Sequence, residues 1–222
     1  MIRAFIFKEW LKLRWAFLGL SLLGLGFLVF INHSLYREFA AGPAVPIWQN
    51  LVERQVMFFA GIKYFGVLAG LVTALVQWLP DIPNRGLRLQ LHLPFPQMQG
   101  MAIVVFCGAL TMIFVCVQIL FLLLVITQYY FPWPVVRAVG LTVIPWMLAG
   151  LPVYAMTGAL LLDTSPVRKV VYGLIGWQMA SLYLAGCGYA GFEGVLGLYG
   201  LMALLMLFAP FIPAERFKRG AL

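Results

Sequence analysis

"WAFLGLSLLGLGFLVFINHSL", residues Trp15–Leu35, is a stretch of 21 residues without a charged side chain, close to the start of the chain. A helix needs about 20 apolar residues to cross a membrane, whereas the apolar part of a cleavable signal peptide has only about 7–15. The stretch therefore predicts a transmembrane helix that is retained. Further apolar stretches of similar length follow it, so it is typical of the whole chain.

The composition indicates the same class of protein. Hydrophobic residues make up 64% of the 222 residues and charged residues 10%, with a mean hydropathy of +0.98. Soluble domains carry about 25% charged residues. The net charge of +8 is spread singly or in small groups between apolar stretches, so we expect positive-inside loops rather than a nucleic-acid partner. The predicted fold class is an all-α membrane protein.

Apolar segments divide the chain into expected membrane crossings. Two turn-like motifs separate neighbouring segments, "QYYFPWP" at Gln128–Pro134 and the glycine-rich "GCGYAGFEGVLG" at Gly186–Gly197. We find no soluble domain and expect a single transmembrane domain over residues 1–222. The six expected spans cover about residues 15–35, 57–79, 101–126, 138–162, 170–188 and 194–212.

The distribution of basic residues predicts the orientation. Eleven lie on the side of the two termini: Arg3, Lys8, Lys12, Arg14, Arg85, Arg88, Arg168, Lys169, Arg216, Lys218 and Arg219. Four lie on the other side: Arg37, Arg54, Lys63 and Arg137. Because cytoplasmic loops are enriched in Lys and Arg, we expect both termini in the cytoplasm and the protein in a bacterial inner membrane.

The N-terminal segment 2–13 has the pattern of a helix that lies in the inner membrane interface. At 100° per residue, Lys8, Glu9 and Lys12 share one sector. The apolar residues of the segment gather on the opposite side: Ile2, Ile6, Trp10 and Leu13. We expect the charged sector to face water and the apolar sector to face the membrane.

The inner segment Asn84–Leu93, "NRGLRLQLHL", is the longest polar connection on the cytoplasmic side. Its alternation of polar and apolar residues is compatible with a strand, but a lone strand would leave its backbone groups without partners. As a helix it places Arg85, Arg88 and His92 on one face. We expect a short docking helix, with a basic loop held by lipid headgroups as the alternative.

Polar groups inside the spans are few. No expected span contains Asp or Glu, on which proton and sodium relays usually depend, so an ion-coupled carrier is disfavoured. The candidates for a substrate pathway are Lys63, Gln77, Gln118, Tyr154 and Gln178. Snorkelling is the alternative role of Lys63, and hydrogen bonding between helices is the alternative role of the neutral groups.

Two further motifs concern the shape of the spans. "GVLAG", Gly66–Gly70, is a GxxxG motif that permits close helix approach and would suit a dimer face. The fourth span contains Pro145, Gly150 and Pro152. Since proline removes a backbone donor and bends a helix, we expect this span to be irregular.

These features together resemble the six-span permeases of ABC exporters, the type-2 class. The resemblance rests on the N-terminal helix, the six spans with both ends inside, the short inner helix and the stretch "LHLPFPQMQGMAIVV" that leads into the third span. Many members of that family have a re-entrant hairpin before the sixth span. The turn at Gly186–Gly194 is short for one, which is a departure from the family pattern.

The resemblance implies a dimer of permeases, made with a second copy or a paralogue, docked on a dimer of ABC ATPase subunits. This chain lacks the Walker A loop, G-x-x-x-x-G-K-S/T. We therefore expect this chain to bind no cofactor and to have no enzymatic activity of its own, while ATP and Mg would bind to the partner ATPase. The implied coupling residues are Asn84, Arg85, Leu87, Arg88, Gln90, Leu91, His92 and Leu93. The implied secondary ATPase contact is formed by Asp163, Arg168 and Lys169.

The expected function is thus a permease subunit of an ABC transporter that exports a hydrophobic or amphipathic substrate. The alternative from a different class is a non-transporting membrane anchor or assembly subunit of a larger complex, for example a redox complex. Such a subunit would also have few polar groups inside its spans.

Overall fold

The computed structural model describes residues 2–41, 56–81, 97–186 and 188–218. Within these ranges every regular element is a helix, which confirms the predicted all-α class. The elements are α1 (Ile2–Ala41), η1 (Ala60–Ile62), α3 (Phe65–Trp78), η2 (Leu79–Asp81), α5 (Gln97–Tyr130), α6 (Trp133–Leu148), α7 (Gly150–Leu162), α8 (Pro166–Leu184), η3 (Glu193–Val195), α9 (Leu196–Met206) and α10 (Phe211–Lys218).

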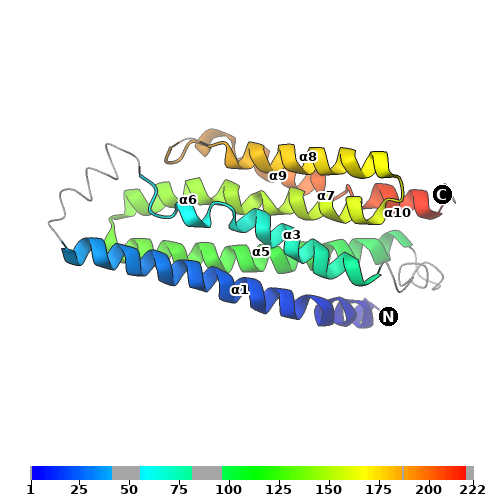
Figure 1. Cartoon of the computed structure of the whole chain (residues 1–222), viewed down its shortest axis with the longest axis horizontal. Helices are drawn as coiled ribbons and strands as arrows, with labels where there is room; N and C mark the ends of the chain where they lie inside the picture. Colours follow the sequence, from blue (N-terminus) through cyan, green and yellow to red (C-terminus); the bar gives the residue numbers. More distant parts are fainter. Residues whose placement is uncertain (1, 42–55, 82–96, 187, 219–222) are drawn as a thin grey trace.

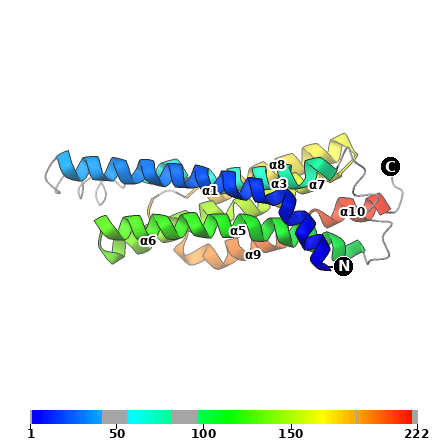
Figure 2. The same ribbon diagram turned by 90° about the horizontal axis from the view of Figure 1, so that it is seen from below.

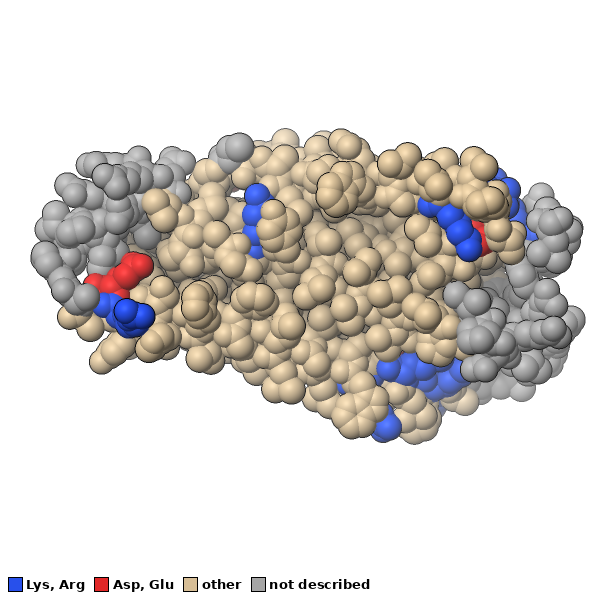
Figure 3. Space-filling model, in the orientation of Figure 1, with Lys and Arg blue, Asp and Glu red and all other residues tan. Residues whose placement is uncertain are grey.

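The long helices lie side by side along one axis (Figure 1). α6 and α7 follow one another in one direction as a single interrupted span, and α8 runs back along them (Figure 1). The start of α1 and the end of α10 lie at the same end of the bundle, together with the turn between α7 and α8 (Figure 1). We call this end the basic end and the opposite one, with the turn between α5 and α6, the far end. Charged side chains gather at the two ends and leave the middle of the visible face almost uncharged (Figure 3). This distribution is the one that a bilayer requires.

Five helical segments are long and apolar enough to cross a membrane: Arg3–Ala40, Ala60–Trp78, Met98–Tyr130, Trp133–Leu162 and Glu193–Arg216. They fit an integral membrane protein and correspond to five of the six expected spans. The expected fifth span, 170–188, corresponds to α8, which is not among these five. Nevertheless α8 packs along α7 and lies parallel to the bundle axis (Figure 1).

The outer surface of the bundle is apolar. Large hydrophobic side chains are exposed on α1, α5, α8 and α9, for example Phe30, Phe114, Trp177 and Leu204. Such a surface would be costly in water, where large contiguous apolar patches are rare. It is suited to contact with lipid chains.

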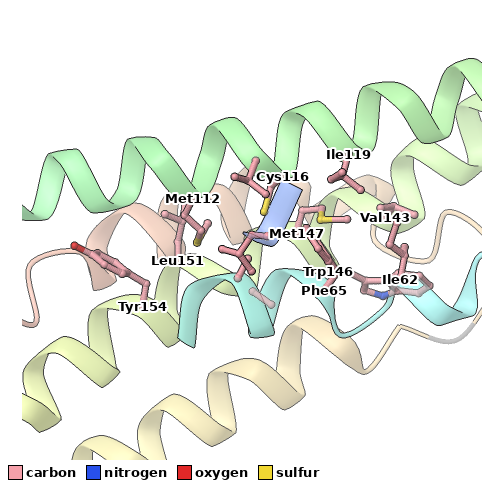
Figure 4. Packing of buried hydrophobic residues seen from close by; sticks show 14 of the residues in the cluster. Ile62, Phe65, Met112, Cys116, Ile119, Val143, Trp146, Met147, Leu151 and Tyr154 are labelled. Carbon is pink, nitrogen blue, oxygen red and sulfur yellow. The ribbon is translucent and has the colours of Figure 1, made fainter. Parts of the chain in front are cut away.

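The centre of the bundle is the α6–α7 pair, the most deeply buried of the five candidate spans. The expected irregularity is confirmed, since α6 ends at Leu148 and α7 starts at Gly150. Pro152 has no N–H to donate to the carbonyl of Leu148, so the helical ladder is interrupted there. Apolar side chains such as Met112, Ile119 and Trp146 fill the space between α5, α3 and this pair (Figure 4).

Glycines allow α3 to approach the break between α6 and α7. A Cβ atom at Gly66 would overlap the carbonyl oxygen of Trp146, and one at Gly70 would overlap the backbone of Gly150. Gly66 and Gly70 are both buried. The close helix approach predicted from this GxxxG motif therefore occurs within the chain, and its interpretation as a dimer face is wrong.

Candidate functional site

The N-terminal turns of α1 carry a carboxylate into the bundle. Residues 2–13 are the first turns of the 40-residue helix α1, and these turns bend away from its main axis (Figure 2). Glu9 is fully buried, and so is Leu13, whereas Ile6 and Trp10 are about half exposed. The expected orientation, with Glu9 facing water and Leu13 opposite to it, is therefore wrong.

The buried side of α1 explains this orientation. Glu9, Leu13, Ala16 and Leu20 are all buried, and they recur at the spacing of one helix face. α1 packs along α5 and α3 through this face. The buried face of the span thus continues into the N-terminal turns, and Glu9 is its first residue in chain order.

Gln77 is the centre of the polar cluster that receives Glu9. Its Nε2 donates to Oε2 of Glu9 at 3.0 Å and to the backbone carbonyl of Val104 at 2.8 Å. Its Oε1 accepts a hydrogen bond of 2.8 Å from the hydroxyl of Tyr154. Gln77 and Tyr154 are both fully buried. One side chain at the end of α3 is therefore bonded to α1, α5 and α7.

Gly108 provides the space for this arrangement on α5. A Cβ atom at position 108 would overlap both the Oε1 of Gln77 and the hydroxyl of Tyr154. Any larger residue would push these two side chains away from the helix. The absence of a side chain at Gly108 is thus part of the geometry of the cluster.

The charge of Glu9 is compensated inside the chain. Nζ of Lys12 lies 3.0 Å from Oε1 of Glu9, and the side chain of Lys12 is only 14% exposed. A buried carboxylate is costly unless it is paired and hydrogen-bonded. Glu9 has both an ion pair and the hydrogen bond from Gln77, and these interactions offset the free-energy cost of burying its carboxylate.

The cluster acts as a joint between helices. Both N–H groups of Gln77 and its carbonyl oxygen are occupied by protein groups. Side-chain hydrogen bonds between membrane helices stabilise by about 0.6 kcal/mol on average and up to about 2 kcal/mol. Within the described ranges, no three His, Cys, Asp or Glu side chains are close enough to hold a metal ion.

The other expected pathway residues do not join this cluster. Gln118 lies on α5 about 15 Å from Gly108 at 1.5 Å per residue, and it accepts a hydrogen bond of 3.3 Å from Ser21. Gln178 is exposed on the outer side of α8. Of the five candidates, the structure brings together only Gln77 and Tyr154.

Lys63 is the residue directly after η1, and it is half-buried. Its Nζ lies 5.9 Å from the centre of the Trp146 ring. A cation–π contact of this kind holds a lysine against an aromatic face. Lys63 is therefore engaged inside the chain at a site separate from Glu9 and Gln77.

Asp163, Arg168 and Lys169, the residues of the expected secondary ATPase contact, lie at the turn between α7 and α8. Nε of Arg168 donates to Oδ2 of Asp163 at 2.8 Å, and its Nη2 donates to Oδ1 at 2.8 Å. These hydrogen bonds lower the pKa of the Asp163 carboxyl from its ordinary value, although burial opposes this effect. Asp163 is buried, so its carboxylate is already engaged within the chain. A role of Lys169 in partner binding stays a prediction.

The expected coupling segment 84–93 lies outside the described residues. The described chain ends before it at η2 (Leu79–Asp81) and resumes after it at Gln97, the first residue of α5. The cluster around Gln77 is thus four residues from the end of η2.

Sequence reasoning missed Glu9, Lys12 and Gly108 as members of the site. Glu9 was assigned to the water-facing sector because the charged residues of the segment share one side. A usable signal existed, since the positions 9, 13, 16 and 20 continue one face of the first span. No sequence signal marked Gly108, because its role depends on the neighbouring helices.

Comparisons with protein-family models, with curated proteins and with solved structures find no match for this chain.

Proposed function

We propose that this chain is the membrane-spanning permease subunit of an ABC transporter, an exporter of a hydrophobic or amphipathic substrate. ATP hydrolysis in a separate ATPase dimer drives it, and a second copy or a paralogue of the permease completes the pathway. ATP and Mg bind to the ATPase. The permease itself holds no cofactor and catalyses no reaction.

The observation that carries the proposal is the position of Gln77. It lies in the last turn of α3, just before the segment 84–93 that would dock on the ATPase. Its hydrogen bonds join α3 to α1, α5 and α7. A push on the segment after α3 would therefore move four helices together rather than bend α3 alone.

The proposal includes six crossings with both termini in the cytoplasm of a bacterial cell. α8 is the fifth crossing, because it packs along α7 and exposes Leu174 and Trp177 on its outer side. Exposed aromatic side chains support the two interface levels, with Trp10 and Trp15 near the basic end and Tyr129 and Trp133 near the far end.

The topology is testable by cysteine labelling. Arg168→Cys and Tyr129→Cys are introduced separately into a chain whose native cysteines are replaced, and intact cells are treated with a membrane-impermeant maleimide. Labelling of the variant at 129 without labelling of the variant at 168 is the expected result. The reverse pattern would overturn the orientation.

The function is tested on the complex with its ATPase. Replacing Leu87, Arg88 and Leu91 with Glu should abolish association with the ATPase subunit. Gln77→Leu should keep the ATPase bound but lower substrate-stimulated hydrolysis by about 10-fold, because the helices are uncoupled. Gln178→Leu, on the exposed side of α8, is the matched control and should behave as the unmodified chain.

Two results would contradict the proposal. Unchanged association and hydrolysis after the triple replacement would exclude segment 84–93 as the coupling element. Purification of a complex that absorbs as haem or flavin and contains no ATPase would establish the anchor subunit of a redox complex instead.

A further inference from the structure

The outer face of the N-terminal turns of α1 combines arginines with aromatic side chains. At 100° per residue, Arg3, Phe7, Trp10 and Arg14 fall within a sector of about 60°. All four side chains are exposed. Glu9 and Leu13, which face the bundle, lie outside this sector, about 110° from its centre. We call these four residues the outer N-terminal face.

Because Glu9 points into the bundle, the only charged side chains on this face are the two arginines. Residues 3–15 contain four basic residues, Arg3, Lys8, Lys12 and Arg14, and one acidic residue, Glu9. Glu9 is buried and paired with Lys12. In the described part of the chain, no ion pair involves Arg3 or Arg14. Two guanidinium groups therefore point outward without an acidic partner.

The position of Arg14 is suited to the boundary between headgroups and acyl chains. Its guanidinium carbon lies 5.3 Å from the centre of the Trp15 ring, and Trp15 is 68% exposed. Beyond it, Leu18 and Leu22 continue the exposed apolar side of α1. Tryptophan is enriched at the membrane interface, where its ring sits at headgroup level. The arginine therefore lies at the depth of the bilayer at which lipid phosphates lie.

The bend of α1 extends the same environment to Arg3. The N-terminal turns leave the main axis of the helix (Figure 2), so they run obliquely to the bundle rather than straight out of it. Phe7 and Trp10 lie between Arg3 and Arg14 on the same face. A face that alternates cations with large apolar groups matches a phospholipid, which has a charged head and apolar chains.

We propose that the outer N-terminal face binds the headgroups of anionic phospholipids of the inner leaflet. The phosphate accepts hydrogen bonds from Arg3 and Arg14, while Phe7 and Trp10 contact the upper part of the acyl chains. Anionic lipid is preferred to zwitterionic lipid, since no carboxylate on this face offsets the arginines. A soluble acidic protein would not match the exposed apolar residues that surround them.

Titration of phosphatidylglycerol into the purified, delipidated chain, followed by native mass spectrometry, measures the binding. Each arginine near a membrane surface contributes about 5-fold in affinity for anionic lipid, so Arg3→Gln with Arg14→Gln should weaken binding by about 30-fold. Arg3→Lys with Arg14→Lys keeps the charge and should retain most of the affinity. Phosphatidylcholine should bind more weakly to the unmodified chain and be insensitive to the double replacement.

Arg37→Gln is the matched control, since Arg37 is an exposed arginine on the far part of the same helix. It should leave phosphatidylglycerol binding unchanged. Equal loss of affinity in Arg37→Gln, or unchanged affinity in the double glutamine variant, would overturn the proposal. Competition by inorganic phosphate at equal concentration would also overturn it, because a free anion site needs no acyl chain. A thermal unfolding scan of each variant shows whether it is folded.

Discussion

The side-chain amide of Gln77 donates a hydrogen bond of 3.0 Å to the carboxylate of Glu9, 68 residues earlier in the chain. This contact fixes the bent N-terminal turns of α1 to the end of α3. It also explains how an acidic residue is tolerated at the edge of an apolar bundle. The same amide holds α5 and α7, so stability and coupling can be probed at one position.

Removal of Lys12 should destabilise the chain. Lys12→Ala leaves the buried carboxylate of Glu9 without a counter-charge, and loss of one partner of a buried pair costs about 3 kcal/mol. Thermal or chemical unfolding in detergent measures the loss. Lys8→Ala, which changes a neighbouring basic residue that is in no described ion pair, should stay within about 0.5 kcal/mol of the unmodified chain.

A second variant separates charge from packing. Glu9→Gln combined with Lys12→Ala removes both charges and keeps an amide oxygen that accepts from Gln77, so it should be more stable than Lys12→Ala alone. If Lys12→Ala is no less stable than Lys8→Ala, the ion pair with Glu9 does not hold the N-terminal turns.

The space at Gly108 should be essential for the cluster. Gly108→Ala places a methyl group against Gln77 and Tyr154, and overpacking of a closely packed site costs about 1–3 kcal/mol. Gly26→Ala is the matched control, because a Cβ atom there meets nothing within 4 Å. Unfolding in detergent compares the two, and a smaller loss in Gly108→Ala than in Gly26→Ala would contradict the geometry.

The glycine contact between α3 and α7 should affect the fold and not the association of chains. Gly70→Ala forces a methyl group against the backbone of Gly150, so the two helices must move apart. We expect a loss of at least about 2 kcal/mol with an unchanged ratio of monomer to dimer in crosslinking experiments. Loss of the dimer in a variant that remains folded would restore the motif as a dimer face.

Asp163 should make stability depend on pH in the acid range. Its pKa in the folded chain is lowered from the ordinary 3.8 by the hydrogen bonds from Arg168. The stabilisation is therefore fully present above pH 3.8 and is lost as the pH falls through the lower folded-state pKa. Unfolding temperatures measured down this range should fall more steeply for the unmodified chain than for Asp163→Asn.

Arg168→Ala tests the cause of this dependence. It removes the largest cause of the lowered pKa of Asp163, while the N–H of Ser165 and the charge of Arg216 remain. Stability should therefore fall less steeply in the acid range than in the unmodified chain and be lower at neutral pH. Lys169→Ala, the adjacent basic residue, should keep the pH dependence. Superimposable acid profiles of all four chains would show that Asp163 and Arg168 do not pair in solution.

Much of the fold followed from the sequence because lipid imposes simple rules. The apolar segments predicted the long helices, and the prolines of the fourth span predicted the break between Leu148 and Gly150. Of the candidate site, Gln77 and Tyr154 were recognised as polar groups inside spans. The hydrogen bond between these two side chains was not predicted. They are 77 positions apart in the chain, and a single sequence does not show which residues of two distant spans lie at the same level.

The N-terminal segment shows where the sequence misleads. A sector of charged residues predicts a water-facing side, but Glu9 accepts a hydrogen bond from Gln77 on another helix. This bond, together with the ion pair to Lys12 on its own helix, offsets the cost of burying the carboxylate. The pattern of one helix contains no information on such partners. The GVLAG motif misleads in the same way. It indicates that another helix packs closely against it, but the sequence does not show whether that helix belongs to the same chain or to a second one.

The sequence by itself indicated that this protein is built for a membrane and gave the approximate length of its apolar segments, because both depend on local composition. Only the tertiary structure decided which face of each helix points inward. That choice depends on contacts between distant residues, such as Gly70 with Gly150 and Glu9 with Gln77. Apolar side chains suit lipid and protein interior equally well, so hydrophobicity alone cannot distinguish the two sides of a membrane helix.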